Sequence, residues 1–543
     1  MNLRPIIEVA QQLGLSAKDL EPYGDRKAKI DLDALRSSSG NRKGKLILVT
    51  AMTPTSHGEG KTVTSIGLAM GLRQLGHQSV VCLRQPSVGP VFGIKGGAVG
   101  GGKATVEPSQ DINMGFTGDI DRVTTAHNLL AAIVDNHLFH GNELGIDPRR
   151  VTWPRSLDME DRALRKVVTG LGQKKGFPRE DEFIITAASE LMAVLSLSRD
   201  YVDLKERLAQ IIVGYTYNGR PVLAAQLKVV GAIAATMRDT LKPNLVQTSE
   251  GTPALIHGGC FGNIAHGTTT LISILLGLQH AEYCIVEAGF GSDLGAEKFV
   301  DISARTGGFN VDSAVVVASI RALKHHGGAR NGSDSSGLGA VKQGLDNLDK
   351  HIENVRTLGL TPVVAINKFP ADTQDELNLL GEFCDEREAP WAVSTVFEEG
   401  GRGAVDLSER VMEAVRKGSI ARPLYSLNAS LEDKLDTIVR TMYGGAGVDY
   451  TIEARKDIKR IAELDHVHKP VCVAKTPLSL SDDQTKLGRP RGFTPLVRNV
   501  LPAGGAGFNI AYMGDVLTMP GLPKHPAAEL IELTDDGLVK GLI

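Results

Sequence analysis

Short runs of apolar residues alternate along this chain with longer segments whose apolar residues recur at helical spacing. The runs at residues 46–49, 79–87, 314–324 and 361–370 are predicted as strands, and the segment 282–299 begins with another. Residues 155–245 are predicted to be mainly helical and connecting. This alternation of strands and helices predicts an α/β fold with a doubly wound, mostly parallel sheet.

The length of 543 residues sets the expected number of domains at three or four. From length and pattern we predict a large N-terminal nucleotide-binding domain at residues 1–350. Two smaller α/β domains are predicted at residues 351–455 and 456–543. The strand predicted at 361–369 could instead belong to the first domain, so this boundary is open.

The most informative segment is residues 45–72, where an apolar strand, a glycine-containing turn and a helix follow one another. A phosphate-binding loop (P-loop) requires this order. Glycines let backbone N–H groups approach phosphate oxygens, and the start of the helix adds unpaired N–H groups and a partial positive charge. Lys61 supplies a mobile charge for the terminal phosphates, and Thr62 supplies a hydroxyl for Mg²⁺. The predicted nucleotide-binding residues are Thr53, Gly58, Glu59, Gly60, Lys61 and Thr62.

The match to the P-loop pattern is incomplete. In G-x-x-x-x-G-K-[ST] the first glycine would stand at position 55, which is Thr55. The alternative is an ordinary turn between a strand and a helix, with Lys61 as a solvated surface charge. Because the strand, the glycines, Lys61 and Thr62 occur in the required order, the nucleotide site is favoured.

Two charged residues stand at the ends of other predicted strands. Arg84 lies near the end of the strand at 79–87, and ligands of open α/β sheets bind beyond the carboxyl ends of strands. We therefore predict that Arg84 faces the same pocket as Lys61, the alternative being a surface arginine. Glu287 ends an apolar strand and is a candidate to hold Mg²⁺ through water, the alternative being a capping or salt-bridging carboxylate. The aspartate of the N-K-x-D motif of GTPases is absent after Asn367, so ATP is favoured over GTP.

Composition excludes several classes of function. The chain has 60 basic and 63 acidic residues, so no basic excess points to nucleic acid and no polybasic run points to a membrane. The start of the chain carries Glu8 and lacks the apolar core of a secretory signal, and no apolar run is long enough to span a bilayer. The five cysteines are scattered, which indicates reduced thiols and a cytoplasmic protein.

Several long strings carry a resemblance to a known family. They are TP…GEGKT, PSVGPVFGIKGGAVGGG, FTGD, EGTPALIHGG, NIAHG, EAGFGSDLGAEKF, AINKFPADT, AKTPLSLSDD and TMPGLPKHP. Together they make the chain resemble the formate–tetrahydrofolate ligase family over nearly its whole length. The resemblance implies that ATP, formate and tetrahydrofolate give 10-formyltetrahydrofolate, ADP and phosphate. The implied intermediate is formyl phosphate, and the folate amine then attacks its formyl carbon.

The resemblance also implies roles for particular residues. Lys61 and Arg84 would clamp formyl phosphate, and Asp119 would lie near the folate amine. Phe369 and Phe397 match two positions where aromatic rings sandwich the folate, so the second domain would contribute to the folate site. Magnesium-ATP, a monovalent cation (K⁺ or NH₄⁺) and a homotetramer are implied in the same way.

The chain departs from the family pattern near these sites. Thr55, Ser56 and His57 stand where the family has one residue, and the other departures are Gln85 for Glu, Gly115 for His, Phe397 for Trp, Gly262 for Ala, and Lys103 where Tyr-Ser-Gln would follow the glycines. They leave two alternatives to the ligase open. One is a divergent relative that uses the same acyl-phosphate chemistry on another acid or acceptor. The other is a relative that binds nucleotide without catalysis.

Overall fold

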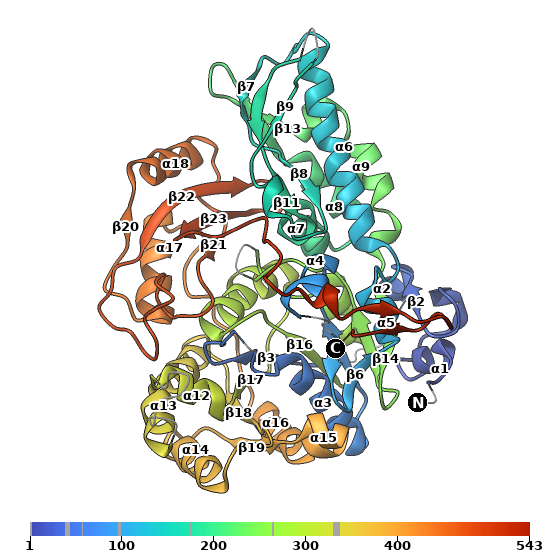
Figure 1. Cartoon of the computed structure of the whole chain (residues 1–543), viewed down its shortest axis with the longest axis vertical. Coiled ribbons are helices and arrows are strands. Elements are labelled where there is room, and N and C mark those ends of the chain that lie inside the picture. Colours follow the sequence, from blue (N-terminus) through green and yellow to red (C-terminus); the bar gives the residue numbers. More distant parts are fainter. Residues whose placement is uncertain are drawn as a thin grey trace.

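The computed structural model describes residues 3–37, 44–56, 58–95, 99–172, 176–262, 265–328 and 337–542. Its central element is a 12-stranded sheet (Figure 1). Ten strands follow one another across it in the order β1 (Leu20–Pro22), β2 (Ala28–Ile30), β14 (Asn244–Thr248), β15 (Pro253–Ile256), β4 (Ser79–Leu83), β16 (Tyr283–Glu287), β3 (Lys45–Ala51), β17 (Ser313–Ala318), β18 (Pro362–Asn367) and β19 (Trp391–Ser394). The short strands β5 (Gly100–Gly101) and β6 (Ala104–Glu107) pair beside β14.

From β15 to β19 every neighbouring pair is parallel. The strands β1, β2, β14 and β6 pair antiparallel, so the sheet is mixed and mostly parallel. This confirms the predicted α/β class and the predicted mostly parallel sheet. The strand predicted at 314–324 is too long, because β17 ends at Ala318 and the helix α12 (Ile320–His326) begins two residues later.

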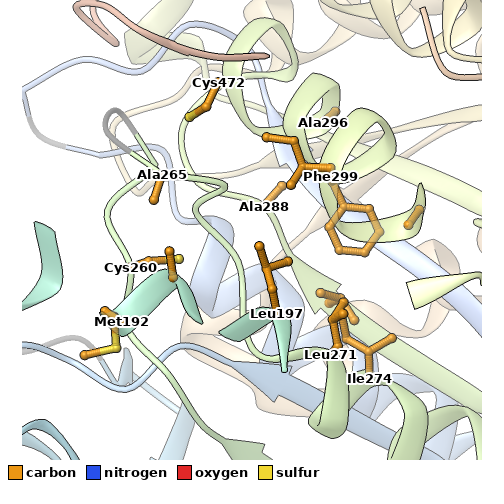
Figure 2. Close-up of a cluster of buried hydrophobic side chains, with 14 of the residues drawn as sticks. Met192, Leu197, Cys260, Ala265, Leu271, Ile274, Ala288, Ala296, Phe299 and Cys472 are labelled. Atoms are coloured by element: carbon orange, nitrogen blue, oxygen red, sulfur yellow. The ribbon is translucent and has the colours of Figure 1, made fainter. Parts of the chain in front are cut away.

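Helices cover both faces of the parallel part, which explains why its strands are apolar throughout. Alternate residues of β3 enter two different cores. Ile47 and Val49 pack in one core with α3 (Lys61–Gln74) and α16 (Val405–Lys417), whereas Leu46 and Leu48 belong to the other core with α10 (Leu271–His280), α12 and α13 (Leu338–Thr357). Figure 2 shows part of the second core, which includes Leu271 and Ile274 of α10 together with Leu197 and Cys260.

Residues 155–245 consist mainly of helices and connecting segments, as predicted, but they also contain several short strands that the prediction missed. The structure forms β8 (Arg155–Leu157), β9 (Val167–Thr169), β10 (Arg179–Asp181), β11 (Phe183–Ile185), β12 (Ile212–Thr216) and β13 (Pro221–Leu223). The strand β7 (Ile146–Val151) joins β12 and β13 in a three-stranded sheet. The helices of this region are α6 (Asp119–Phe139), α7 (Glu190–Leu197), α8 (Tyr201–Ala209) and α9 (Val230–Thr236). Most of these strands have three residues, too few for a period of two to stand out.

A further sheet lies near the C-terminal end of the chain. It has the order β20 (Asp449–Tyr450), β22 (Leu496–Ala503), β23 (Phe508–Met513) and β21 (Val471–Ala474), with α17 (Leu431–Ile438) and α18 (Ile452–Glu463) nearby (Figure 1). The strands β18 and β19 belong to the large sheet, so the predicted boundary at residue 350 falls between strands of one sheet. The predicted units 1–350, 351–455 and 456–543 stay predictions. Among the helices of the described ranges, none is long and apolar enough to cross a membrane.

Candidate functional site

Three neighbouring parallel strands, β4, β16 and β3, bring the predicted phosphate-binding residues to one edge of the sheet. The strand β16 lies between the other two. Arg84 follows β4 directly, Glu287 is the last residue of β16, and the loop 52–60 joins β3 to α3. All three segments therefore meet at the carboxyl edge of the sheet, where ligands of α/β proteins bind.

The side chains of Thr62, Arg84 and Glu287 contact one another at this edge. The Thr62 hydroxyl donates a 2.7 Å hydrogen bond to Oε2 of Glu287. The Arg84 guanidinium lies 3.7 Å from the other carboxylate oxygen and donates a 3.1 Å hydrogen bond to the carbonyl of Cys260. A cavity of about 120 Å³ is lined by these three side chains together with Leu83, Gln85, Pro86, Ser87, Pro90, Val91, Gly259 and Phe261. Pockets for drug-sized ligands span about 300–1,000 Å³, so this cavity suits a small anion rather than a whole nucleotide.

Lys61 lies close enough to Glu287 and Arg84 for their charges to interact, but it is not among the residues that line the cavity. It is the first residue of α3, where the unpaired N–H groups of the helix start also point. The pKa of Lys61 is lowered from its ordinary value, chiefly by burial; the Glu287 carboxylate opposes this shift and Arg84 adds to it. Lys61 therefore carries a poorly solvated charge that an anionic ligand would stabilise.

The loop before α3 requires glycine at two positions. Gly58 and Gly60 have φ angles of 73° and 78°, in the left-handed region that favours glycine. A Cβ on Gly60 would lie 2.2 Å from Nδ2 of Asn367, so that position also has no room for a side chain. Asn367, at the end of β18, donates a 3.1 Å hydrogen bond to the carbonyl of Glu59. The residue that resembled part of a base-reading motif thus supports the loop.

Two of the predicted nucleotide-binding residues are buried and bonded within the protein. Oε1 of Glu59 accepts hydrogen bonds from the backbone N–H and the hydroxyl of Thr55, at 2.8 and 2.9 Å, and Oε2 accepts one from Ser319. The Thr53 hydroxyl lies 2.9 Å from Nε2 of His351. Asn347 also donates to this hydroxyl. These side chains hold the loop in place. The Glu59 carboxylate also holds the inserted Thr55 inside the protein. His57 lies outside the described residues.

Asp119 begins α6 and forms a buried ion pair. Its carboxylate oxygens lie 2.7 and 2.9 Å from Nζ of Lys29, and Asn244 donates a 2.7 Å hydrogen bond to it. Asn244 stands opposite Ile256, and Ile256 stands opposite Leu83, the residue before Arg84. Two strand spacings, about 10 Å, therefore separate the backbone of Asn244 from that of Leu83. Asp119 lies at the same sheet edge but does not line the 120 Å³ cavity.

The two predicted stacking residues follow neighbouring strands. Phe369 comes two residues after β18 and Phe397 three residues after β19, at the same edge of the sheet as the loop 52–60. The Phe397 side chain is 55% exposed, and its ring lies against the backbone of Gly101 and Gly102. Its carbonyl accepts a 2.8 Å hydrogen bond from the N–H of Lys103. The glycine-rich turn and the exposed ring thus form one surface.

Several departures from the family pattern have a visible physical setting. Gly115 has a φ angle of 103°, which a histidine would strain. The side chain of Gln85 is buried beside the cavity, and the backbone N–H of Gln85 donates a 2.6 Å hydrogen bond to the carbonyl of Gly258. A Cβ on Gly262 would lie 3.1 Å from the ring of Phe290, so alanine there would be tight.

The sequence-based prediction did not identify three features of this site. Phe290 has a φ angle of 63°, and such strain in a bulky residue is concentrated at functional sites. Cys260 lies buried with its sulfur 3.6 Å from Nε2 of His266. Burial raises the pKa of the Cys260 thiol, but His266 and Arg84 lower it to about 7. Arg321 contacts both the phosphate loop and Phe369. The GFG string could have drawn attention to Phe290, whereas the other two depend on contacts between distant segments.

The chemistry of the site agrees with a comparison against protein families. Arg84 lines a cavity of anion size, Lys61 stands nearby at the start of α3, and a hydroxyl and a carboxylate meet in the cavity wall. The family model "Formate--tetrahydrofolate ligase" matches residues 1–543, the whole chain. The ligases of this family use ATP to join formate to tetrahydrofolate. The chain belongs to the formate–tetrahydrofolate ligase family, and it is an ATP-dependent ligase of one-carbon metabolism that acts on formate and tetrahydrofolate.

Proposed function

We propose that the reaction proceeds through formyl phosphate, held in the cavity between the ends of β3, β4 and β16. The observation that carries this proposal is the convergence of Thr62, Arg84 and Glu287 beside Lys61 on a cavity of anion size. Formation of formyl phosphate and its reaction with the folate amine both have anionic, oxygen-rich transition states. Fixed positive charges and N–H donors are therefore the groups that lower both barriers.

In the first step an oxygen of formate attacks the terminal phosphorus of ATP, and ADP leaves. We assign Lys61 and the first N–H groups of α3 to the phosphate oxygens. The planar guanidinium of Arg84 can donate to two oxygens at once, and the carbonyl of Cys260 fixes its orientation. In the second step the folate amine attacks the formyl carbon and phosphate leaves. The same donors stabilise the negative charge of the leaving phosphate.

The loop that precedes α3 is proposed to act as a P-loop in a nucleotide-binding unit. Gly58 and Gly60 would present their backbone to the phosphates, while Thr53 and Glu59 would act through the internal hydrogen bonds that hold the loop. The favoured nucleotide base is adenine, since the chain lacks the aspartate that reads guanine.

Mg²⁺ fits the wall of this cavity. No group of three or more His, Cys, Asp or Glu residues that could hold a metal exists within the described ranges. Mg²⁺ needs no such group, since it is usually bound by one or two carboxylates together with substrate phosphates and water. The Thr62 hydroxyl and the Glu287 carboxylate are hard oxygen donors that already touch, and we propose that they hold the ion. When bound, it would neutralise charge on the nucleotide phosphates. A monovalent cation, K⁺ or NH₄⁺, is proposed from the family resemblance alone.

Tetrahydrofolate is proposed to bind along the same edge of the sheet, between Phe369 and Phe397, with its amine toward Asp119. The positions of the two rings after neighbouring strands and the 55% exposure of Phe397 support this placement. The ring of Phe397 is smaller than the indole of a tryptophan and would give the folate less area on which to stack. We also propose the homotetramer and the cytoplasmic location that the resemblance implies. Support for the latter is that all five cysteines lie in the described chain, buried and without a disulfide.

Glu287→Gln tests the proposed magnesium site. We expect the Mg²⁺ concentration for half-maximal ADP release to rise about 10- to 100-fold, because the amide keeps the shape but loses the charge. The measurement is the Mg²⁺ dependence of ADP release with saturating formate and tetrahydrofolate. Glu282→Gln, just before the opposite end of β16 and paired with His77, is the matched control and should leave this dependence unchanged. Equal Mg²⁺ dependence in wild type and Glu287→Gln would remove Glu287 from the site.

A further inference from the structure

Arg321 stands between the phosphate loop and the ring of Phe369. It is the second residue of α12, which begins directly after β17. The strand β17 lies between β3 and β18 in the sheet, and all three are parallel. The first turn of α12 is therefore flanked on one side by the loop that follows β3 and on the other by the segment that follows β18.

On the side of the phosphate loop, α12 makes two contacts with consecutive residues. The Arg321 guanidinium donates a 2.8 Å hydrogen bond to the carbonyl of Gly58. Ser319, which caps the helix by accepting from the N–H of Ala322, also donates to the carboxylate of Glu59. A movement of Gly58 therefore requires a movement of the guanidinium.

On the other side, the guanidinium carbon of Arg321 lies 4.7 Å from the ring centroid of Phe369. This distance is within the range of a cation–π interaction. The backbone of Phe369 is fixed by a 2.8 Å hydrogen bond from its N–H to Asp372. With one ring face covered by Arg321, the opposite face is the one on which a planar ligand can stack.

The guanidinium is not held by a saturated network. Its Nε is buried and has no hydrogen-bond acceptor among the described residues. Among the described residues, the guanidinium donates to Gly58 and lies over Phe369, and its charge also acts on the Asp372 carboxylate that fixes the backbone of Phe369. Its position therefore responds to both the loop and the ring.

We propose that Arg321 is a positioning residue that couples the nucleotide site to the folate site. This inference rests on the proposed placement of folate at Phe369. A nucleotide that orders Gly58 fixes the guanidinium, which in turn fixes the ring on which the pterin stacks. Because coupling between binding sites is reciprocal, tetrahydrofolate tightens nucleotide binding by the same factor. A preference for binding both substrates protects the acyl phosphate from loss before its acceptor is present.

The test measures this coupling factor directly. The dissociation constant of a non-hydrolysable ATP analogue with Mg²⁺ is determined by calorimetry in the presence and absence of saturating tetrahydrofolate. The ratio is the dissociation constant without tetrahydrofolate divided by the constant with it. We expect a ratio of about 5 or more for the wild type, within the usual range for coupled sites. For Arg321→Met the ratio should approach one, and the KM values for ATP and tetrahydrofolate should rise with a smaller change in kcat. Arg321→Lys keeps the charge but cannot both lie over the ring and reach Gly58, so its ratio should fall between the two.

Arg387→Met is the matched control. Arg387 lies 4.8 Å from the ring centroid of Phe383 and also bonds to Asp349, so the substitution removes the same kind of stacking elsewhere. It should leave the ratio at the wild-type value. A wild-type ratio of one, or an unchanged ratio in Arg321→Met and Arg321→Lys, would overturn the proposal. Should Arg321→Met fail to fold, the ratio of Arg321→Lys decides alone.

Phe369→Leu separates this inference from the proposed folate site. If it leaves the dissociation constant of tetrahydrofolate unchanged, folate does not stack on Phe369, and both the placement and the coupling proposal fail. If it weakens folate binding while the Arg321 variants keep the wild-type ratio, the placement stands and the coupling role of Arg321 is rejected.

Discussion

Arg84→Ala is expected to lower kcat by about 10²- to 10³-fold, the usual loss when one donor to a developing oxyanion is removed. Arg84 lines the cavity, and it is the one arginine that does so among the residues that the structure describes. Lys61→Ala is expected to have an effect of the same size, since its charge sits at the start of α3 beside Glu287. The measurement is the steady-state formation of 10-formyltetrahydrofolate, read as methenyltetrahydrofolate after acid treatment, together with ADP release.

The control for these variants is Arg73→Ala, because Arg73 lies in the last turn of α3 at the opposite end from Lys61. It should keep turnover close to the wild-type value. Arg84→Lys keeps the charge but loses the planar fork, so we expect it to remain well below wild type. Turnover within a few-fold of wild type in both Lys61→Ala and Arg84→Ala would mean that these residues do not clamp the anion.

Asp119→Ala is expected to destabilise the protein by about 3–5 kcal/mol, because it leaves the ammonium of Lys29 buried without its partner. Lys29 is 1% exposed and Asp119 3% exposed, so the ion pair is shielded from bulk solvent. The free energy of unfolding is measured by denaturant titration. The double variant Lys29→Met with Asp119→Leu removes both charges and is expected to regain most of the lost stability.

The same double variant decides whether Asp119 also serves the folate amine. If it does, the restored protein should bind tetrahydrofolate weakly and form product slowly, while ADP release with formate alone remains. A fully active double variant would show that Asp119 has only a structural role. A loss of less than 1 kcal/mol in Asp119→Ala would contradict the account of the ion pair.

Local sequence patterns predicted the parts of the site that depend on neighbouring residues. The order of strand, glycines, Lys61 and Thr62 fixes the loop, because the glycines take positive φ angles and the helix begins at Lys61. Arg84 and Glu287 were found because each ends an apolar strand, and parallel strands bring their carboxyl ends together.

The contacts that the sequence did not reveal join distant segments. Lys29 and Asp119 are 90 residues apart, and no local pattern pairs them. Arg321 lay inside a segment predicted as one strand, 314–324. Ser319, a residue type that favours the start of a helix, was the available signal that the strand had ended. The three-residue strands between residues 155 and 245 are defined by their pairing, which the sequence alone does not display.

The most direct test of the central claim, that formyl phosphate forms in this protein, follows the oxygen atoms of formate. Formate labelled with ¹⁸O at both positions is incubated with Mg²⁺, ATP and tetrahydrofolate, and the inorganic phosphate is analysed by mass spectrometry. If formate attacks the terminal phosphorus and the amine then expels phosphate, each phosphate carries one ¹⁸O atom and the formyl group keeps the other. Phosphate without ¹⁸O, in a reaction that still forms 10-formyltetrahydrofolate, would contradict the account.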